Sequence, residues 1–240
     1  MPVSVIETLG PRWFSLYSQF LGLLFPPRCV GCGRVDVWLC PECLAQIPRV
    51  EAPFCPRCGN SVVTAGLCAR CRTAPLQIDR ICSVVYFEGA LRKAMHWLKY
   101  RGRTALADPL GGLMAEYWAQ HPMQFDVIVP VPLHADRLRK RGYNQAALLA
   151  RQMARRVGLM EEEQTLVRQR STSRQVDLNA KQRKQNVRDA FHCSGDGLAG
   201  KQILLIDDVC TTGATLEACA IALLAGGARN VQALTLARAR

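Results

Sequence analysis

The sequence predicts an α/β protein in which a mostly parallel sheet is flanked by helices, with a small cysteine-rich module at the N-terminal side. Two observations predict this fold class. From residue 76 onward, short apolar runs alternate with segments of helical periodicity, which is typical of a parallel sheet covered on both faces. Before residue 75 the chain holds eight of its twelve cysteines, many Pro and Gly, and few long apolar periods. We therefore expect three regions: an N-terminal amphipathic segment (1–28), the cysteine-rich module (29–75) and the α/β domain (76–240).

The N-terminal segment contains an apolar stretch, 13–25, that is interrupted by Ser15, Ser18 and Gln19 and is too short to cross a bilayer. Residues 1–11 contain no Lys or Arg and no small-residue cleavage site follows the stretch, so it lacks the features of a secretory signal. We expect a helix that packs on the rest of the protein, no transmembrane segment, and a cytoplasmic location. In the cytosol cysteines stay reduced and usually bind metal or react.

The cysteines of the module form four Cys-x2-Cys pairs within 43 residues. A two-residue spacer lets both thiolates of a tight turn face one tetrahedral ion, and two such pairs complete a four-sulfur zinc site without an open position. The sequence thus predicts two structural zinc ions in a double zinc ribbon, with the first pair joined to the second and the third to the fourth; an interleaved pairing stays open. Disulfides and an iron–sulfur cluster are the alternatives, but the first conflict with a reducing cytosol and the second usually shows other spacings. The expected ligands are Cys29, Cys32, Cys40, Cys43, Cys55, Cys58, Cys68 and Cys71.

The α/β domain should contain four apolar strands and four helices. The strands are predicted at 81–87, 125–131, 202–206 and 231–236, and the helices at 90–100, 108–120, 144–157 and 215–225. We expect Asp108 to be the N-cap of the helix 108–120, with Pro109 in its first turn. Gly158 should end the helix 144–157. The segment 168–188 is polar, basic and weakly periodic, so it is predicted to be a long flexible loop.

The net charge of +12 points toward anionic partners, although a basic but inert surface is the alternative. The charge is concentrated: residues 135–188 hold 14 Lys or Arg against 5 Asp or Glu. Such clustering favours a surface that binds anions over uniform solubilisation.

The densest group of polar residues follows the predicted strand 202–206. Asp207 and Asp208 come first, at the carboxyl end of the strand, where parallel sheets bind ligands. A turn of small and hydroxyl residues then opens a helix, and its backbone N–H groups and the helix N-terminus can hold a phosphate. The carboxylates would accept hydrogen bonds from a sugar attached to that phosphate; the alternative is a capped turn beside two solvated aspartates. The residues of the turn are Thr211, Thr212, Gly213, Ala214 and Thr215.

Residues 203–215 resemble the phosphoribosyl-pyrophosphate binding motif of type I phosphoribosyltransferases. This resemblance implies that Asp207 and Asp208 contact the ribose 2′ and 3′ hydroxyls and that the turn 211–215 cradles the 5′-phosphate. Residues 129–134, Arg137 and 141–145 are similar to the competence-associated ComF family, which includes the GntX proteins. The opening residues 24–29, the cysteine pairs, and Thr172, Gln175, Leu178, Arg183, Asn186 and Phe191 fit the same family.

The resemblance implies a type I phosphoribosyltransferase-like domain that binds phosphoribosyl pyrophosphate or a nucleotide, with magnesium held by the pyrophosphate and ribose oxygens. It also implies a role in the uptake or use of external DNA, with single-stranded DNA and a protein of the DNA-uptake machinery as partners. The alternative is an active phosphoribosyltransferase of nucleotide metabolism or salvage. No residues that would recognise a base can be named, so the binding function is preferred.

Further residues acquire expected roles from the same resemblance. Pro132, Leu133 and His134 fall in the loop that holds pyrophosphate, with Arg137 and Arg141 just beyond it. His134 could donate to pyrophosphate or cap the following helix, and both roles stay open. The basic segment with Thr172, Gln175 and Arg183 occupies the position of an active-site lid, against the alternative of a disordered insert. Lys99, Arg101 and Arg103 follow a predicted helix and could reach the same pocket or nucleic acid.

Overall fold

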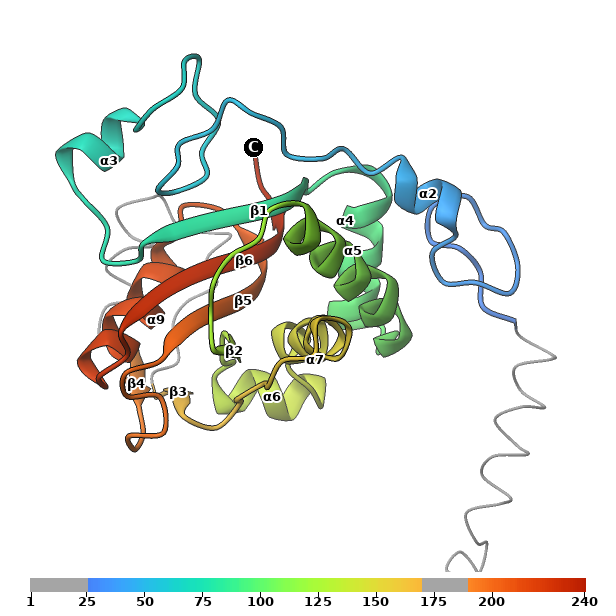
Figure 1. Cartoon of the computed structure of the whole chain (residues 1–240). Coiled ribbons are helices and arrows are strands. Elements are labelled where there is room, and N and C mark those ends of the chain that lie inside the picture. The colour runs from blue at the N-terminus through green and yellow to red at the C-terminus, as the bar shows by residue number, and fades with distance from the viewer. Residues whose placement is uncertain (1–25, 170–189) are drawn as a thin grey trace, which may run out of the picture.

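A four-stranded parallel sheet forms the centre of the α/β domain (Figure 1). The computed structural model describes residues 26–169 and 190–240. The strand order is β1-β6-β5-β2, and every neighbouring pair is parallel, as the sequence predicts. The strands are β1 (Arg80–Tyr86), β2 (Val127–Pro130), β5 (Gln202–Cys210) and β6 (Asn230–Arg238).

Helices cover both faces of this sheet because its central strands are apolar on both sides. Along β5, Ile203 and Leu205 face one core and Leu204 and Ile206 face the other, and all four are fully buried. One core is shared with α4 (Gly89–Tyr100), α5 (Ala107–Gln120) and α7 (Gln145–Val157). The other is shared with α9 (Ala214–Ala225). Within the described residues, none of the helices has the length and apolar character needed to span a membrane.

The bounds of the four predicted helices agree with α4, α5, α7 and α9 to within one residue, but the start of α5 differs in its cap. Asn144 caps α7 with a hydrogen bond from Ala146 N to Asn144 Oδ1 of 3.1 Å, and Gly158 ends that helix in a left-handed conformation. The expectation that Asp108 caps α5 is wrong. A 3-10 turn, Thr104–Leu106, leads directly into the helix, and the Asp108 carboxylate accepts a hydrogen bond of 2.7 Å from Arg156 of α7 instead.

A short antiparallel pair, β3 (Leu166–Arg168) and β4 (Phe191–Cys193), was not predicted. Each strand has three residues, too few for a recognisable alternation. Arg168 therefore ends a strand, although the sequence places it at the start of a flexible loop. The expected lid residues Thr172, Gln175 and Arg183 lie outside the described residues, as does most of the expected N-terminal segment.

The cysteine-rich module runs along the outer edge of β1 and has two halves. Val50 N donates to Val84 O at 3.1 Å, and Tyr86 N donates to Pro48 O at 2.8 Å. The half with α2 (Pro41–Ala45) lies beside α4, and the half with α3 (Ala69–Thr73) lies at the opposite end of the molecule (Figure 1). The module thus reaches both sides of the domain that carries the candidate ligand site.

Candidate functional site

The paired acids lie where β5 loses one neighbour. Its pairing with β2 ends at Ile206, whereas its pairing with β6 continues to Cys210. The strand is therefore four residues longer than predicted, and Asp207 and Asp208 belong to its final stretch. This position keeps both carboxylates on rigid backbone at the carboxyl edge of the sheet, where parallel sheets bind ligands.

Lys99 of α4 forms an ion pair with Asp208 Oδ2, and the two side chains are 21% and 7% exposed. Asp208 Oδ1 also accepts a hydrogen bond of 2.7 Å from Val209 N. The sequence suggested only that Lys99 could reach the pocket; the structure brings its ammonium to the acidic pair. The helix α4 thus supplies a positive charge to a site whose acids come from β5.

Burial, and after it the negative charge of Asp208, raise the pKa of Asp207 to about 8. A hydrogen bond of 2.8 Å from Asp208 N to Asp207 Oδ1 opposes this shift without cancelling it. Two adjacent carboxylates are held together most easily when one of them keeps its proton. The raised pKa of Asp207 favours retention of a proton on this carboxyl.

The turn between β5 and α9 is tight and is centred on Gly213. Gly213 has a φ of +77° and stands at the N-cap of α9, where it offers no side chain to the first turn. A Cβ at this position would lie 3.0 Å from Ile81 Cδ1, so the turn packs closely on β1. Thr212 Oγ1 accepts from Ala214 N at 3.4 Å. A helix N-terminus whose N-cap is a glycine and which is preceded by small residues favours an anion.

The loop after β2 leads into a short helix, α6 (Ala135–Arg141), and approaches the same edge. His134 is the N-cap of α6, and its Nδ1 accepts from Asp136 N at 3.2 Å, so the capping role is the one adopted here. Asn144 donates from Nδ2 to Val131 O at 3.0 Å and so holds this loop to the start of α7. Arg141 donates a hydrogen bond from Nη1 to Gln145 Oε1, and its guanidinium lies over the Tyr100 ring of α4.

Arg168 is a basic residue near the acids that the sequence did not single out. It ends β3, is 8% exposed, and its guanidinium lies 5.2 Å from the centroid of the Phe191 ring on β4. Burial lowers its pKa, the charge of Arg137 lowers it further, and Asp207 acts in the opposite direction. Arg168 therefore lies within electrostatic range of Arg137 and of Asp207.

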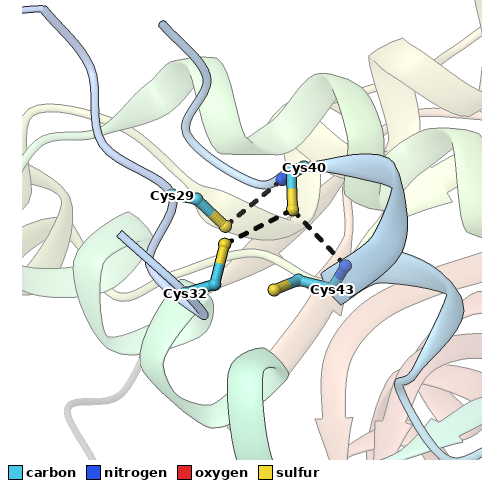
Figure 2. A group of neighbouring side chains, drawn as sticks. All are labelled: Cys29, Cys32, Cys40 and Cys43. Carbon is cyan, nitrogen blue, oxygen red and sulfur yellow. Dashed lines mark hydrogen bonds between the residues drawn. The ribbon is translucent and has the colours of Figure 1, made fainter. Parts of the chain in front are cut away.

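The eight paired cysteines form two clusters, each with four sulfurs within 4.8 Å of one another. The first is Cys29, Cys32, Cys40 and Cys43 (Figure 2), and the second is Cys55, Cys58, Cys68 and Cys71. The consecutive pairing is confirmed and the interleaved one is excluded. The sulfurs of Cys32 and Cys40 lie 3.7 Å apart within the first cluster, and those of Cys58 and Cys68 lie 3.6 Å apart within the second. A zinc ion with bonds of about 2.3 Å to a tetrahedron of sulfurs places them about 3.8 Å apart.

In each cluster, backbone N–H groups favour the thiolate form of one cysteine. Burial alone would raise the pKa of Cys29 and Cys55, but backbone N–H groups outweigh it and lower both to about 6. All twelve cysteines lie in the described ranges and are free thiols. The chemistry of the donors therefore fits structural zinc, since four cysteines occupy all positions of a tetrahedral ion.

We expect the purified protein to contain two zinc ions per chain, one in each cluster. Cys43→Ser should reduce the content to one, because a site with three sulfurs binds zinc more weakly. Cys82→Ala is the matched control, since Cys82 is buried in β1 and belongs to neither cluster. Elemental analysis of dialysed protein measures the content. A wild-type value of one zinc or less would contradict this assignment.

Comparison with known proteins gives matches to both parts of the chain. A family model described as a double zinc ribbon domain matches residues 20–72, and one described as a phosphoribosyl transferase domain matches residues 96–240. The chain is 35% identical over 207 residues to the DNA utilization protein YhgH of Salmonella typhi, which covers 83% of this chain and 90% of that protein. It is 30% identical over 224 residues to competence protein F of Haemophilus influenzae, and the match covers 88% of this chain and 97% of that protein. It is 28% identical over 218 residues to competence protein ComFC of Bacillus subtilis, covering 85% and 86%.

Proposed function

The chain belongs to the ComF family of phosphoribosyl transferase domain proteins with a double zinc ribbon, and from this premise we propose that it binds phosphoribosyl pyrophosphate or a nucleotide in the uptake or use of external DNA. One observation carries the ligand assignment. Two adjacent carboxylates and a glycine-centred turn at the start of the 12-residue helix α9 lie together at the end of β5. This arrangement suits a sugar with a phosphate attached.

The acids and the turn have complementary tasks. Asp207 and Asp208 accept hydrogen bonds from the ribose 2′ and 3′ hydroxyls, and the turn Thr211–Thr215 donates backbone N–H groups and hydroxyls to the 5′-phosphate. Lys99 balances the charge of Asp208 in the free protein. When the hydroxyls engage the carboxylates, the Lys99 ammonium becomes available to the ligand's own anionic groups.

The pyrophosphate of the ligand, with its magnesium, would lie toward the loop after β2. Pro132, Leu133 and His134 line that side, and Arg137 and Arg141 add positive charge beyond them. Guanidinium groups are well shaped for bidentate contact with phosphate oxygens. The proposal also assigns Thr172, Gln175 and Arg183 to this part of the ligand. These three residues belong to the segment 170–189. The residues on either side of it are joined by a hydrogen bond of 2.9 Å from Gln169 N to Ala190 O.

The proposed role in DNA use draws on the names of the relatives and on the charge of the chain. The relatives are named for DNA utilization and competence. A net charge of +12 suits contact with a nucleic acid backbone. We propose single-stranded DNA and a protein of the DNA-uptake machinery as partners.

Calorimetric titration of the zinc-loaded protein with phosphoribosyl pyrophosphate and magnesium tests the ligand assignment. We expect saturable binding of one ligand per chain; an absence of saturable heat at millimolar ligand would overturn the ligand assignment.

Release of pyrophosphate on addition of a nucleobase would identify the alternative, an active transferase. Affinity for single-stranded DNA should fall steeply as salt is raised, because bound phosphates release counterions.

Ligand affinity should rise with pH above neutrality. Asp207 keeps a proton below its raised pKa of about 8, and a neutral carboxyl is a weaker acceptor for the ribose hydroxyls than a carboxylate. Binding therefore favours loss of this proton, and affinity for ribose 5-phosphate should increase from about pH 7 to about pH 8.5, a range in which the ligand's phosphate is already ionised. Titrations across this range measure the change. An affinity that is flat over the whole range would contradict the expectation.

A further inference from the structure

The second cysteine cluster (Cys55, Cys58, Cys68 and Cys71) lies against the turn that follows β5. Arg70 belongs to α3, between two of the cluster's cysteines, and its Nη1 donates a hydrogen bond to Thr212 O. Thr212 immediately precedes Gly213, the N-cap of α9. The backbone of the turn is thus bonded directly to a helix whose position depends on the cluster.

A second arginine makes a similar connection from inside the protein. Arg238, the last residue of β6, is 5% exposed. Its Nη1 donates to Cys58 O at 2.8 Å and lies 3.2 Å from Cys210 Sγ. One buried guanidinium therefore joins the backbone of a cluster cysteine to the last residue of β5.

Close packing completes the connection. Ile81 N donates to Arg57 O at 2.9 Å, and a Cβ on Gly59 would lie 2.6 Å from Ile81 O. The Ile81 side chain in turn packs on Gly213, where a Cβ would lie 3.0 Å from Ile81 Cδ1. The cluster, β1 and the turn are in contact without room for an added methyl group.

The first cluster (Cys29, Cys32, Cys40 and Cys43) has a different neighbour. A Cβ on Gly31 would lie 3.4 Å from Ala90 Cβ at the start of α4. This cluster therefore supports the helix that carries Lys99. The two clusters can be separated experimentally because each packs on a different part of the site.

We propose that zinc in the second cluster fixes the shape of the turn 211–215, with Arg70 and Arg238 as positioning residues for the phosphate of the ligand. The role of the turn in phosphate binding rests on the proposed function above. A site that is competent only part of the time binds with an affinity reduced by that fraction. Loss of either connection should therefore weaken phosphate binding even though neither arginine needs to touch the ligand.

Arg70→Ala and Arg72→Ala form a matched pair for the first test. Both residues lie on α3, but Arg72 donates to Leu67 O at 3.2 Å, within the module. In zinc-loaded protein, Arg70→Ala should weaken binding of ribose 5-phosphate by about 10-fold, the size of one lost hydrogen bond. Arg72→Ala should bind as the wild type does, and both variants should keep two zinc ions. Equal affinity in the two variants would overturn the proposal.

Arg238→Met removes the buried connection without placing or removing a charge on the surface of the turn. It should weaken binding in the same direction as Arg70→Ala, because both variants loosen the contact of the turn with the second cluster. Wild-type affinity in Arg238→Met would contradict a positioning role for this residue.

Hydrogen exchange of the backbone amides of residues 211–215 tests the proposal without any ligand. Cys68→Ser and Cys32→Ser should each lose one zinc ion, from the second and first cluster respectively. Exchange in the turn should become about 10-fold faster in Cys68→Ser and in Arg70→Ala, and stay unchanged in Cys32→Ser. Unchanged exchange in Cys68→Ser would sink the proposal, whether or not the wild type binds sugar phosphates. If the wild type binds no sugar phosphate but the exchange responds as expected, only the proposed function fails.

Discussion

Asp208→Asn should lower the affinity for phosphoribosyl pyrophosphate by about 100-fold, and Asp207→Asn by at least about 10-fold, since a hydrogen bond to a charged group contributes about 1.5–3 kcal/mol. The larger effect is expected at Asp208, which is 5% exposed and is the partner of the Lys99 ion pair. An amide in its place accepts the ribose hydroxyl less strongly and leaves the ammonium without its counter-charge. Calorimetric titration in the presence of magnesium measures both changes.

Asp126→Asn is the matched control for these variants. The Asp126 carboxylate accepts a hydrogen bond of 2.8 Å from Gln202 N, at the opposite end of the strand that carries the acids. Its loss should leave ligand affinity at the wild-type value. If Asp208→Asn also bound within about twofold of the wild type, the assignment of the acids to ribose would be wrong.

Gly213→Ala is expected to produce the second large effect, a loss of phosphate affinity of about 10- to 100-fold. A φ of +77° costs a residue with a Cβ about 1–2 kcal/mol, and this Cβ would also meet Ile81 Cδ1 at 3.0 Å. The backbone strain and the close contact with Ile81 can be relieved only if the turn changes shape, and the amides of this turn hold the phosphate. Titration with ribose 5-phosphate measures the loss.

Gly158→Ala is the matched control, because it introduces the same kind of backbone strain outside the turn 211–215. Gly158 also has a left-handed φ, +71°, at the end of α7, but a Cβ there meets no atom within 4 Å. It should lower the thermal stability by a similar amount and leave the ligand affinity unchanged. Equal affinities for the two alanine variants would show that the turn does not bind the phosphate.

The sequence predicts the sheet and both parts of the chain because the relevant signals are local. The run Ile203–Ile206 is apolar at every position, as expected of a short strand that is buried on both faces. The two-residue spacing within each Cys-x2-Cys pair is also a local signal, and it predicts the two zinc sites. Asp207, Asp208 and the turn 211–215 were found because they are contiguous in the chain.

Features that depend on contacts between distant residues could not be predicted. Arg70 meets Thr212 across 142 positions, and no local pattern marks either residue for the other. The ion pair of Lys99 with Asp208 likewise depends on where α4 packs. At Asp108 a local rule failed, because the preceding 3-10 turn already supplies the helix start and Arg156 competes for the carboxylate.

A crystal structure of the zinc-loaded protein soaked with ribose 5-phosphate tests the central assignment most directly. We expect the phosphate on the backbone amides of residues 211–215 and the two ribose hydroxyls on the carboxylates of Asp207 and Asp208. A turn without phosphate, its amides directed into the protein and Asp208 still paired with Lys99, would contradict it.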